Sequence, residues 1–75
     1  MKIIIRDAKT LGQAIRERRK LAGIRIDDAA ALCGIAVSTL SAMENGSRPA
    51  GIDKILPVLE KLGLRLTIGN DDGLS

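Results

Sequence analysis

The 75-residue chain contains no tryptophan, tyrosine, phenylalanine or histidine, and it has a single cysteine, Cys33. Without aromatic side chains, a core has to be built from leucine, isoleucine, valine, alanine and methionine. A domain of this length buries only about 60% of the surface of its unfolded chain, so a core of small aliphatic side chains is marginal. These absences favour a single domain, residues 1–75, that is stabilised as an obligate homodimer.

The same absences argue against several kinds of site. A lone cysteine forms no internal disulfide and, without histidine, makes no metal site. We therefore expect no metal or other cofactor, and a reducing, cytoplasmic environment. Cys33 is expected to fill a core position, and the scattered acidic residues and helix-separating glycines argue against an enzyme. No signal peptide is evident, and no apolar run approaches the roughly 18 residues of a membrane span, so no membrane partner is expected.

Positive charge is concentrated near the N-terminus. Residues 1–25 contain eight basic and two acidic residues, a local balance of +6, whereas the whole chain has a net charge of +3. A basic half on a small domain suits a polyanionic partner such as nucleic acid. The alternative is an ordinary solvated helix face, and the residues that follow favour nucleic acid.

The apolar pattern predicts a mainly α domain with four helices in residues 11–62 and a short β-strand at each end. A β-branched run predicts the N-terminal strand at 1–6, and alternating apolar and polar residues predict the C-terminal strand at 64–68. Residues 70–75 are expected to form a flexible tail. The helices are expected at about 11–22, 26–33, 37–44 and 52–62.

Three residues are expected to shape these helices. Thr10 is suited to be the N-cap of the first helix, and Gly23 is suited to end it. Pro57 falls within the fourth helix, where it should cause a kink or delay the start of the helix. The apolar face of this fourth helix is expected to contain Ile52, Ile55, Leu56, Leu59 and Leu62.

Both predicted strands need partners that a small helical domain does not offer. An isolated two-stranded ribbon is marginal in water, and the economical partner is a second copy related by a two-fold axis. We expect the C-terminal strand to pair across this axis, with Leu64, Leu66 and Ile68 in the dimer contact. The N-terminal strand either joins the same sheet or binds elsewhere.

Residues 26–46 carry the most informative pattern in the chain. Ala30 allows two short helices to approach closely, and Gly34 permits the turn between them. The apolar residues that follow are expected to point back into a shared core: Ile35, Leu40 and Met43. Such a helix pair usually presents its second helix to another molecule, most often DNA.

Residues 11–62 resemble the Cro/C1 (xenobiotic-response-element, XRE) helix-turn-helix family. The similar segments are LGQAIRERRKLAGI, AALCGIAVSTLSAMENG and ILPVLEKLGL, of which STLSAMENG is the most specific. The segment LGLRLTI, directly after the fourth helix, is similar to the HipB antitoxin subgroup. This resemblance implies a lambda-repressor-like fold and a homodimer formed through the C-terminal strand. It also implies two partners, a double-stranded DNA operator and a HipA-like serine/threonine kinase toxin.

The resemblance assigns DNA contacts to individual residues. The base-facing positions of the third helix correspond to Val37, Ser38, Ser41 and Ala42. A common phosphate contact of the family corresponds to Arg48, and the further candidates for phosphate binding are Arg16 and Arg25. None of the four base-facing residues is arginine, lysine, asparagine or glutamine, so none makes the bidentate contacts that read guanine or adenine.

Arg19 and Glu44 correspond to an ion pair that ties the first helix to the third in relatives. The alternative is that they are two independent surface charges. Other family residues are missing from this chain. Ile26 stands where relatives often have glutamine, and Arg25 and Ala36 stand where they often have a serine or threonine cap.

Two functions are compatible with the sequence. The first is a dimeric DNA-binding regulator, an antitoxin that represses its own toxin–antitoxin operon and binds mainly phosphates, with modest sequence specificity. The second is a protein-interaction module that binds a toxin or kinase, with little or no sequence-specific DNA binding. We favour the first.

Overall fold

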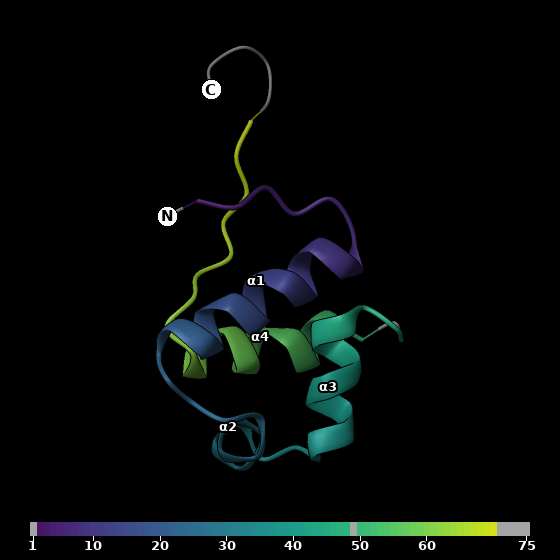
Figure 1. Cartoon of the computed structure of the whole chain (residues 1–75). Helices are drawn as coiled ribbons and strands as arrows, with labels where there is room; N and C mark the ends of the chain where they lie inside the picture. Colours follow the sequence, from purple (N-terminus) through teal and green to yellow (C-terminus); the bar gives the residue numbers. More distant parts are fainter. Residues whose placement is uncertain (1, 49, 71–75) are drawn as a thin grey trace.

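Four helices make up most of the structure (Figure 1). The computed structural model describes residues 2–48 and 50–70. The helices are α1 (Ala8–Leu21), α2 (Ile26–Cys33), α3 (Val37–Asn45) and α4 (Ile52–Lys61). The predicted mainly α domain with four helices is therefore confirmed. Residues 71–75 of the predicted tail, and the first residue of the predicted N-terminal strand, lie outside the described residues.

α1 begins three residues earlier than the sequence predicted, because Asp7 rather than Thr10 is its N-cap. The backbone N–H of Thr10 donates to Asp7 Oδ1 at 2.8 Å, and the backbone N–H of Asp7 donates to Thr10 Oγ1 at 3.1 Å. The two residues form a capping box, in which Thr10 is the third helical residue instead of the cap. The backbone hydrogen bond from Thr10 holds the pKa of the Asp7 carboxyl below its ordinary value, and the Thr10 side chain adds to this effect. Gly23 follows the helix with a φ of +70°, as predicted.

The core is aliphatic and takes residues from all four helices. Its largest fully buried side chains are those of Ile15, Leu40 and Val58. The other members of the core are Ala29, Ala30, Met43, Ile55, Leu59 and Leu62. No single helix among the described residues is long and apolar enough to cross a membrane. Among these residues, only α2 and α3 taken together have the length and apolar composition of a membrane span, and the chain is sharply bent between them. Their apolar residues contribute to this core.

Cys33 packs against the core and is partly buried. Burial raises the pKa of its thiol, although Lys61 acts weakly in the opposite direction. Because the thiolate is the reactive form of cysteine, this side chain is a poor nucleophile at neutral pH.

The face that α4 turns to the core agrees with the prediction at Ile55, Leu59 and Leu62 and differs from it elsewhere. The buried residues have the spacing of one helical stripe and are Ile55, Val58, Leu59 and Leu62. Ile52 and Leu56 were expected on this stripe, but they lie on its flank and are 56% and 45% exposed. Ile52 and Leu56 are four positions apart, which is also the spacing of a single helix face. The sequence pattern alone therefore does not show whether the core receives their stripe or the neighbouring one that contains Val58. Pro57 lies on the exposed side inside the helix and does not delay its start.

The two chain ends leave the helical body on the side opposite α2 (Figure 1). No β-strand forms within the described residues, so the strands predicted at 1–6 and 64–68 are not confirmed. The physical reason is that neither segment lies along another strand of the same chain with which it can exchange backbone hydrogen bonds. Leu64 packs against the core, whereas Ile4 and Ile68 stay outside it and are 74% and 99% exposed.

Candidate nucleic-acid interface

α2 and α3 form a sharply bent helix pair. The chain bends by 107° between them. Gly34, which follows α2 with a φ of +71°, makes the turn, and the N–H of Ile35 donates to the Ala30 carbonyl at 3.0 Å. Ala30 is buried in the core. The predicted pair of short helices, joined by a turn at Gly34, is therefore confirmed.

α3 has one face in the core and one accessible face. Its buried face consists of Leu40, Met43 and Glu44. The residues predicted to face DNA bases are all accessible: Val37 and Ser38 are exposed, and Ser41 and Ala42 are half-buried. The structure thus leaves the four predicted base-facing residues open to a partner molecule.

Asn45 belongs to the same accessible face, and the sequence reasoning missed it. It is exposed at the end of α3, seven residues after Ser38. Residues 38, 41, 42 and 45 are spaced so that they lie on one side of a helix. This spacing is the sequence signal that places Asn45 beside the predicted base-facing residues. It carries the one side-chain amide on α3, the group that makes the paired donor and acceptor contacts by which adenine is read.

Arg18 and Arg19, two neighbouring arginines near the end of α1, link this helix to other helices. Arg19 and Glu44 form a buried, bidentate ion pair, with Nε–Oε2 at 2.6 Å and Nη2–Oε1 at 2.9 Å. Arg19 Nη1 also donates to the Ile24 carbonyl at 3.0 Å. Arg18 Nε donates to the Leu62 carbonyl at 2.9 Å and so links the ends of α1 and α4. α3 is therefore fixed to α1 by a charge pair whose side chains are only 10% and 3% exposed.

The ion pair favours the charged form of Arg19. The hydrogen bond to Glu44 raises the pKa of Arg19 further above its ordinary value, and this outweighs the opposing effect of burial. Among the described residues, no buried side-chain nitrogen or oxygen lacks a hydrogen-bond partner. The pair is therefore fully satisfied, which is the condition for a buried charge to be tolerated.

The backbones of α1 and α3 come unusually close at Gly12. A methyl group at this position would overlap the carbonyl oxygens of Met43 and Glu44 and lie 2.7 Å from the Glu44 carbonyl carbon. Gly46, which follows α3 with a φ of +64°, is the second close point, because a Cβ there would lie 2.7 Å from Lys9 Cα. The C-terminal end of α3 is thus held against the first half of α1.

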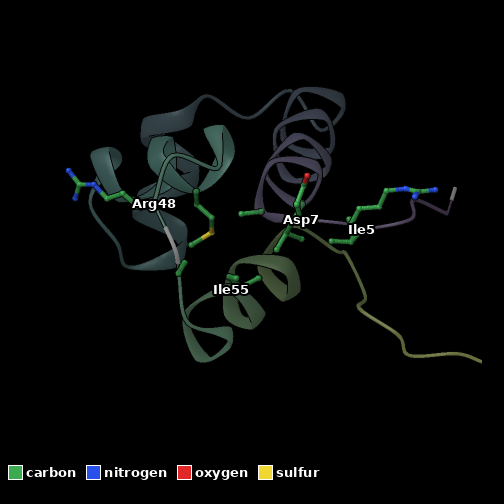
Figure 2. A pocket seen from close by; sticks show the side chains of 9 residues that line it. Ile5, Asp7, Arg48 and Ile55 are labelled. Carbon is green, nitrogen blue, oxygen red and sulfur yellow. The ribbon is translucent and has the colours of Figure 1, made fainter.

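The three predicted phosphate-binding arginines are exposed and come from different parts of the fold. Arg16 lies on α1, Arg25 precedes α2, and Arg48 lies in the loop after α3. Arg48 extends away from the helical body at the edge of an open groove, as Figure 2 shows. Arg25 lies near Asp27, with Nε–Oδ1 at 3.5 Å, and both side chains are mostly exposed.

A bent helix pair whose second helix has an accessible polar face defines a helix-turn-helix domain. Proteins of this class place that second helix in the major groove of DNA. Among known families, the one described as Helix-turn-helix matches residues 15–68. The chain therefore belongs to the helix-turn-helix family, of the Cro/C1 (XRE) type, which confirms the family resemblance. No curated protein sequence matches the chain.

Solved structures with a similar fold contain the protein HipB. A HipB variant in complex with the O2 20mer has a TM-score of 0.83 and 22% sequence identity, and the match covers 95% of this chain and 99% of that one. A HipB–O4 20mer complex and a HipA–HipB–O2–O3 complex each have a TM-score of 0.82 and 23% identity. Each of these matches covers 93% of this chain and 99% of the other. At this level of identity, the likeness establishes the fold.

Proposed function

We propose that the protein is a dimeric DNA-binding transcriptional regulator, a HipB-like antitoxin that represses its own operon in the cytoplasm. The observation that carries the proposal is the accessible polar face of α3, which the Arg19–Glu44 pair and the Gly12 contact hold in one position. The similarity to HipB in complexes with 20mers supports it. The ligand is a double-stranded DNA operator.

In this proposal, α3 lies in the major groove and its small side chains read the bases. The hydroxyls of Ser38 and Ser41 bond base edges with little selectivity, and Val37 and Ala42 contact thymine methyl groups. Asn45, at the far end of the helix, adds the one amide. Most of the affinity comes from phosphate contacts by the exposed arginines Arg16, Arg25 and Arg48.

Dimerisation sets which DNA sequences can be bound. We propose that the copies associate through residues 64–68, with Leu64, Leu66 and Ile68 in the contact. In a two-fold dimer, the two α3 helices reach half-sites about 34 Å, or one helical turn of DNA, apart. Half-site spacing then contributes specificity that the small side chains of α3 do not supply.

A HipA-like serine/threonine kinase toxin is the proposed protein partner, supported by the fold similarity to the HipA–HipB–O2–O3 complex. The second candidate is an interaction module that binds such a kinase but has little affinity for specific DNA. The small side chains on the exposed face of α3 favour this alternative. The amide of Asn45 is the only group on that face that can make a bidentate contact with a base.

A mobility-shift titration against the promoter of the protein's own operon separates the two functions. Nanomolar binding that weakens steeply with salt supports the regulator. No binding below about 10 μM, the strength of non-specific contact, supports the interaction module.

Arg48→Ala is expected to weaken binding to all DNA sequences alike, by about fivefold, and to reduce the salt slope by about one unit, because one phosphate contact is lost. Ser38→Ala is instead expected to reduce the preference for the operator over unrelated DNA by about fivefold, the value of one neutral hydrogen bond. Binding isotherms over a salt series, for operator and scrambled duplexes, measure both quantities. Lys61→Ala, at the end of α4 away from the Arg48 loop, is the matched control. Similar behaviour of Arg48→Ala and Ser38→Ala would contradict the assigned roles.

Removing residues 64–75 is expected to give a monomer or an unfolded chain, because the proposed dimer contact is lost and the remaining core is thin. Sedimentation equilibrium and circular dichroism measure the two outcomes. A shorter deletion of residues 71–75 is the control and should leave the dimer intact. A folded dimer after the longer deletion would rule out association through residues 64–68.

A further inference from the structure

α3 ends at Asn45, and Gly46 follows it to form the one Asn-Gly pair in the sequence. In such a pair, the backbone nitrogen of glycine attacks the amide carbon of the asparagine side chain. Glycine makes the attack easy, because it has no side chain to obstruct its own nitrogen. The other asparagine, Asn70, precedes Asp71, whose side chain hinders the same reaction. Asn45 is therefore the asparagine that the sequence marks for spontaneous deamidation.

The reaction at this pair needs water as its one co-reactant. The Gly46 nitrogen gives its proton to solvent and bonds to Cγ of Asn45, the Cγ–Nδ2 bond breaks, and Nδ2 leaves as ammonia. Water then opens the cyclic imide at either of its two carbonyl carbons. One opening gives aspartate, and the other gives isoaspartate, in which the main chain runs through Cβ and Cγ. Both products carry a carboxylate in place of the amide.

The end of α3 restrains the nitrogen that has to attack. The backbone N–H of Gly46 donates to the Met43 carbonyl at 3.2 Å, and that of Ser47 donates to the Ala42 carbonyl at 3.1 Å. Together with the positive φ of Gly46, these two bonds form a Schellman motif. The Gly46 nitrogen keeps its proton while its hydrogen bond persists. The helical backbone of Asn45 also holds this nitrogen out of the plane of the ring that has to form.

Packing adds a second restraint on the same dipeptide. The end of α3 meets the start of α1 (Figure 1), and a Cβ on Gly46 would lie 2.7 Å from Lys9 Cα. Asn45 and Gly46 therefore reach the reactive geometry only when the end of α3 opens away from α1. For a reaction of this kind, the rate follows the fraction of molecules in which the local structure is open. The isoaspartate product also adds one carbon to the main chain where the two backbones leave no room for it.

We propose that Asn45–Gly46 is a self-modification site, through which the protein loses a DNA contact with time at a rate set by the opening of α3. Asn45 is exposed on the same face as Ser38 and supplies the one amide there. A carboxylate at this position accepts hydrogen bonds but does not donate them, and the phosphates of DNA repel it. The consequence for DNA rests on the proposed function, whereas the modification itself does not.

Mass spectrometry with peptide mapping follows the conversion of both asparagines at neutral pH, in buffer and in urea. In urea, Asn45 is expected to react at least about tenfold faster than Asn70, and folding is expected to slow Asn45 by about tenfold or more. Glu44→Ala removes the charge pair that holds α3 and should speed the conversion of Asn45 in buffer by at least about tenfold, with no change in urea. Asp27→Ala, in an exposed pair, is the matched control and should change neither rate.

The same incubation tests the loss of the DNA contact. Wild-type protein aged until most of Asn45 has reacted is expected to bind the promoter duplex about tenfold more weakly than fresh protein in a mobility-shift titration. Asn45→Gln keeps an amide but closes the ring much more slowly, so it should retain its own starting affinity through the incubation.

Three results would overturn the inference: Asn45 reacting no faster than Asn70 in urea, Glu44→Ala leaving the rate in buffer unchanged, or aged protein binding the duplex as tightly as fresh protein. Fresh protein that does not bind the duplex would instead overturn the proposed function, while the mass data still decide whether Asn45 is modified.

Discussion

Replacing Glu44 with alanine is expected to lower the free energy of unfolding by about 3–5 kcal/mol. The substitution leaves the Arg19 guanidinium buried beneath α3 with only the Ile24 carbonyl as a partner. Domains of this size have total stabilities of roughly 4–11 kcal/mol, so the loss would be a large part of the whole. Urea unfolding followed by circular dichroism, at one fixed protein concentration, measures the difference.

Two controls separate the buried pair from charge effects in general. Asp27→Ala removes the partner of Arg25 in an exposed pair, and its cost should stay below about 1 kcal/mol. The double variant Arg19→Met with Glu44→Leu removes both charges and keeps the volume, so it should regain most of the lost stability. If the double variant is as unstable as Glu44→Ala, the unpaired charge is not the cause.

Gly12→Ala is the second substitution with a large expected effect, a loss of about 3 kcal/mol. By helix propensity alone, alanine inside α1 would stabilise the protein by about 1 kcal/mol, so the sign of the change is diagnostic. The added methyl group overlaps backbone carbonyl oxygens of α3, which cannot rotate away as a side chain can. Urea unfolding measures the change, and Gly69→Ala, where the methyl group meets nothing within 4 Å, is the control. A stabilising Gly12→Ala would show that α1 and α3 are not in close contact.

A second pair of glycines isolates the contact from the backbone conformation. Gly34 and Gly46 have similar positive φ angles, +71° and +64°, so alanine has a similar backbone cost of about 1–2 kcal/mol at each. A Cβ at Gly34 has nothing within 4 Å, whereas one at Gly46 meets the Lys9 backbone. The difference between Gly46→Ala and Gly34→Ala therefore measures the second close approach of α3 to α1.

Much of the helical architecture could be predicted because its signals are local. The turn at Gly34 and the end of α3 at Gly46 follow from the left-handed backbone conformation that glycine adopts readily. The start of α1 was placed too late because Asp7 and Thr10 are both suitable caps, and only the reciprocal bonds between them show which one is the cap.

Features that depend on contacts between distant segments were less accessible. No local pattern distinguishes the Val58 stripe of α4 from the Ile52–Leu56 stripe, because the choice depends on how the whole helix docks. The close approach at Gly12 has no signature in its neighbours. The Arg19–Glu44 pair came from the family resemblance rather than from the spacing of the two residues. The predicted end strands lack a partner within a single chain, so one chain leaves them unpaired.

The division of α3 into two faces has a consequence for how such a protein can change over time. Leu40, Met43 and Glu44 form the buried face that holds the helix in place, and none of them is a proposed DNA contact. Exposed positions such as Ser38 and Asn45 carry almost none of the folding energy, since surface changes usually alter stability by less than about 0.5 kcal/mol. Mutations can therefore accumulate on the exposed face of α3, the proposed DNA-reading surface, without unfolding the domain. A lineage of such chains can acquire new operators while keeping one scaffold, and two copies in one cell can diverge in the sequences that they recognise.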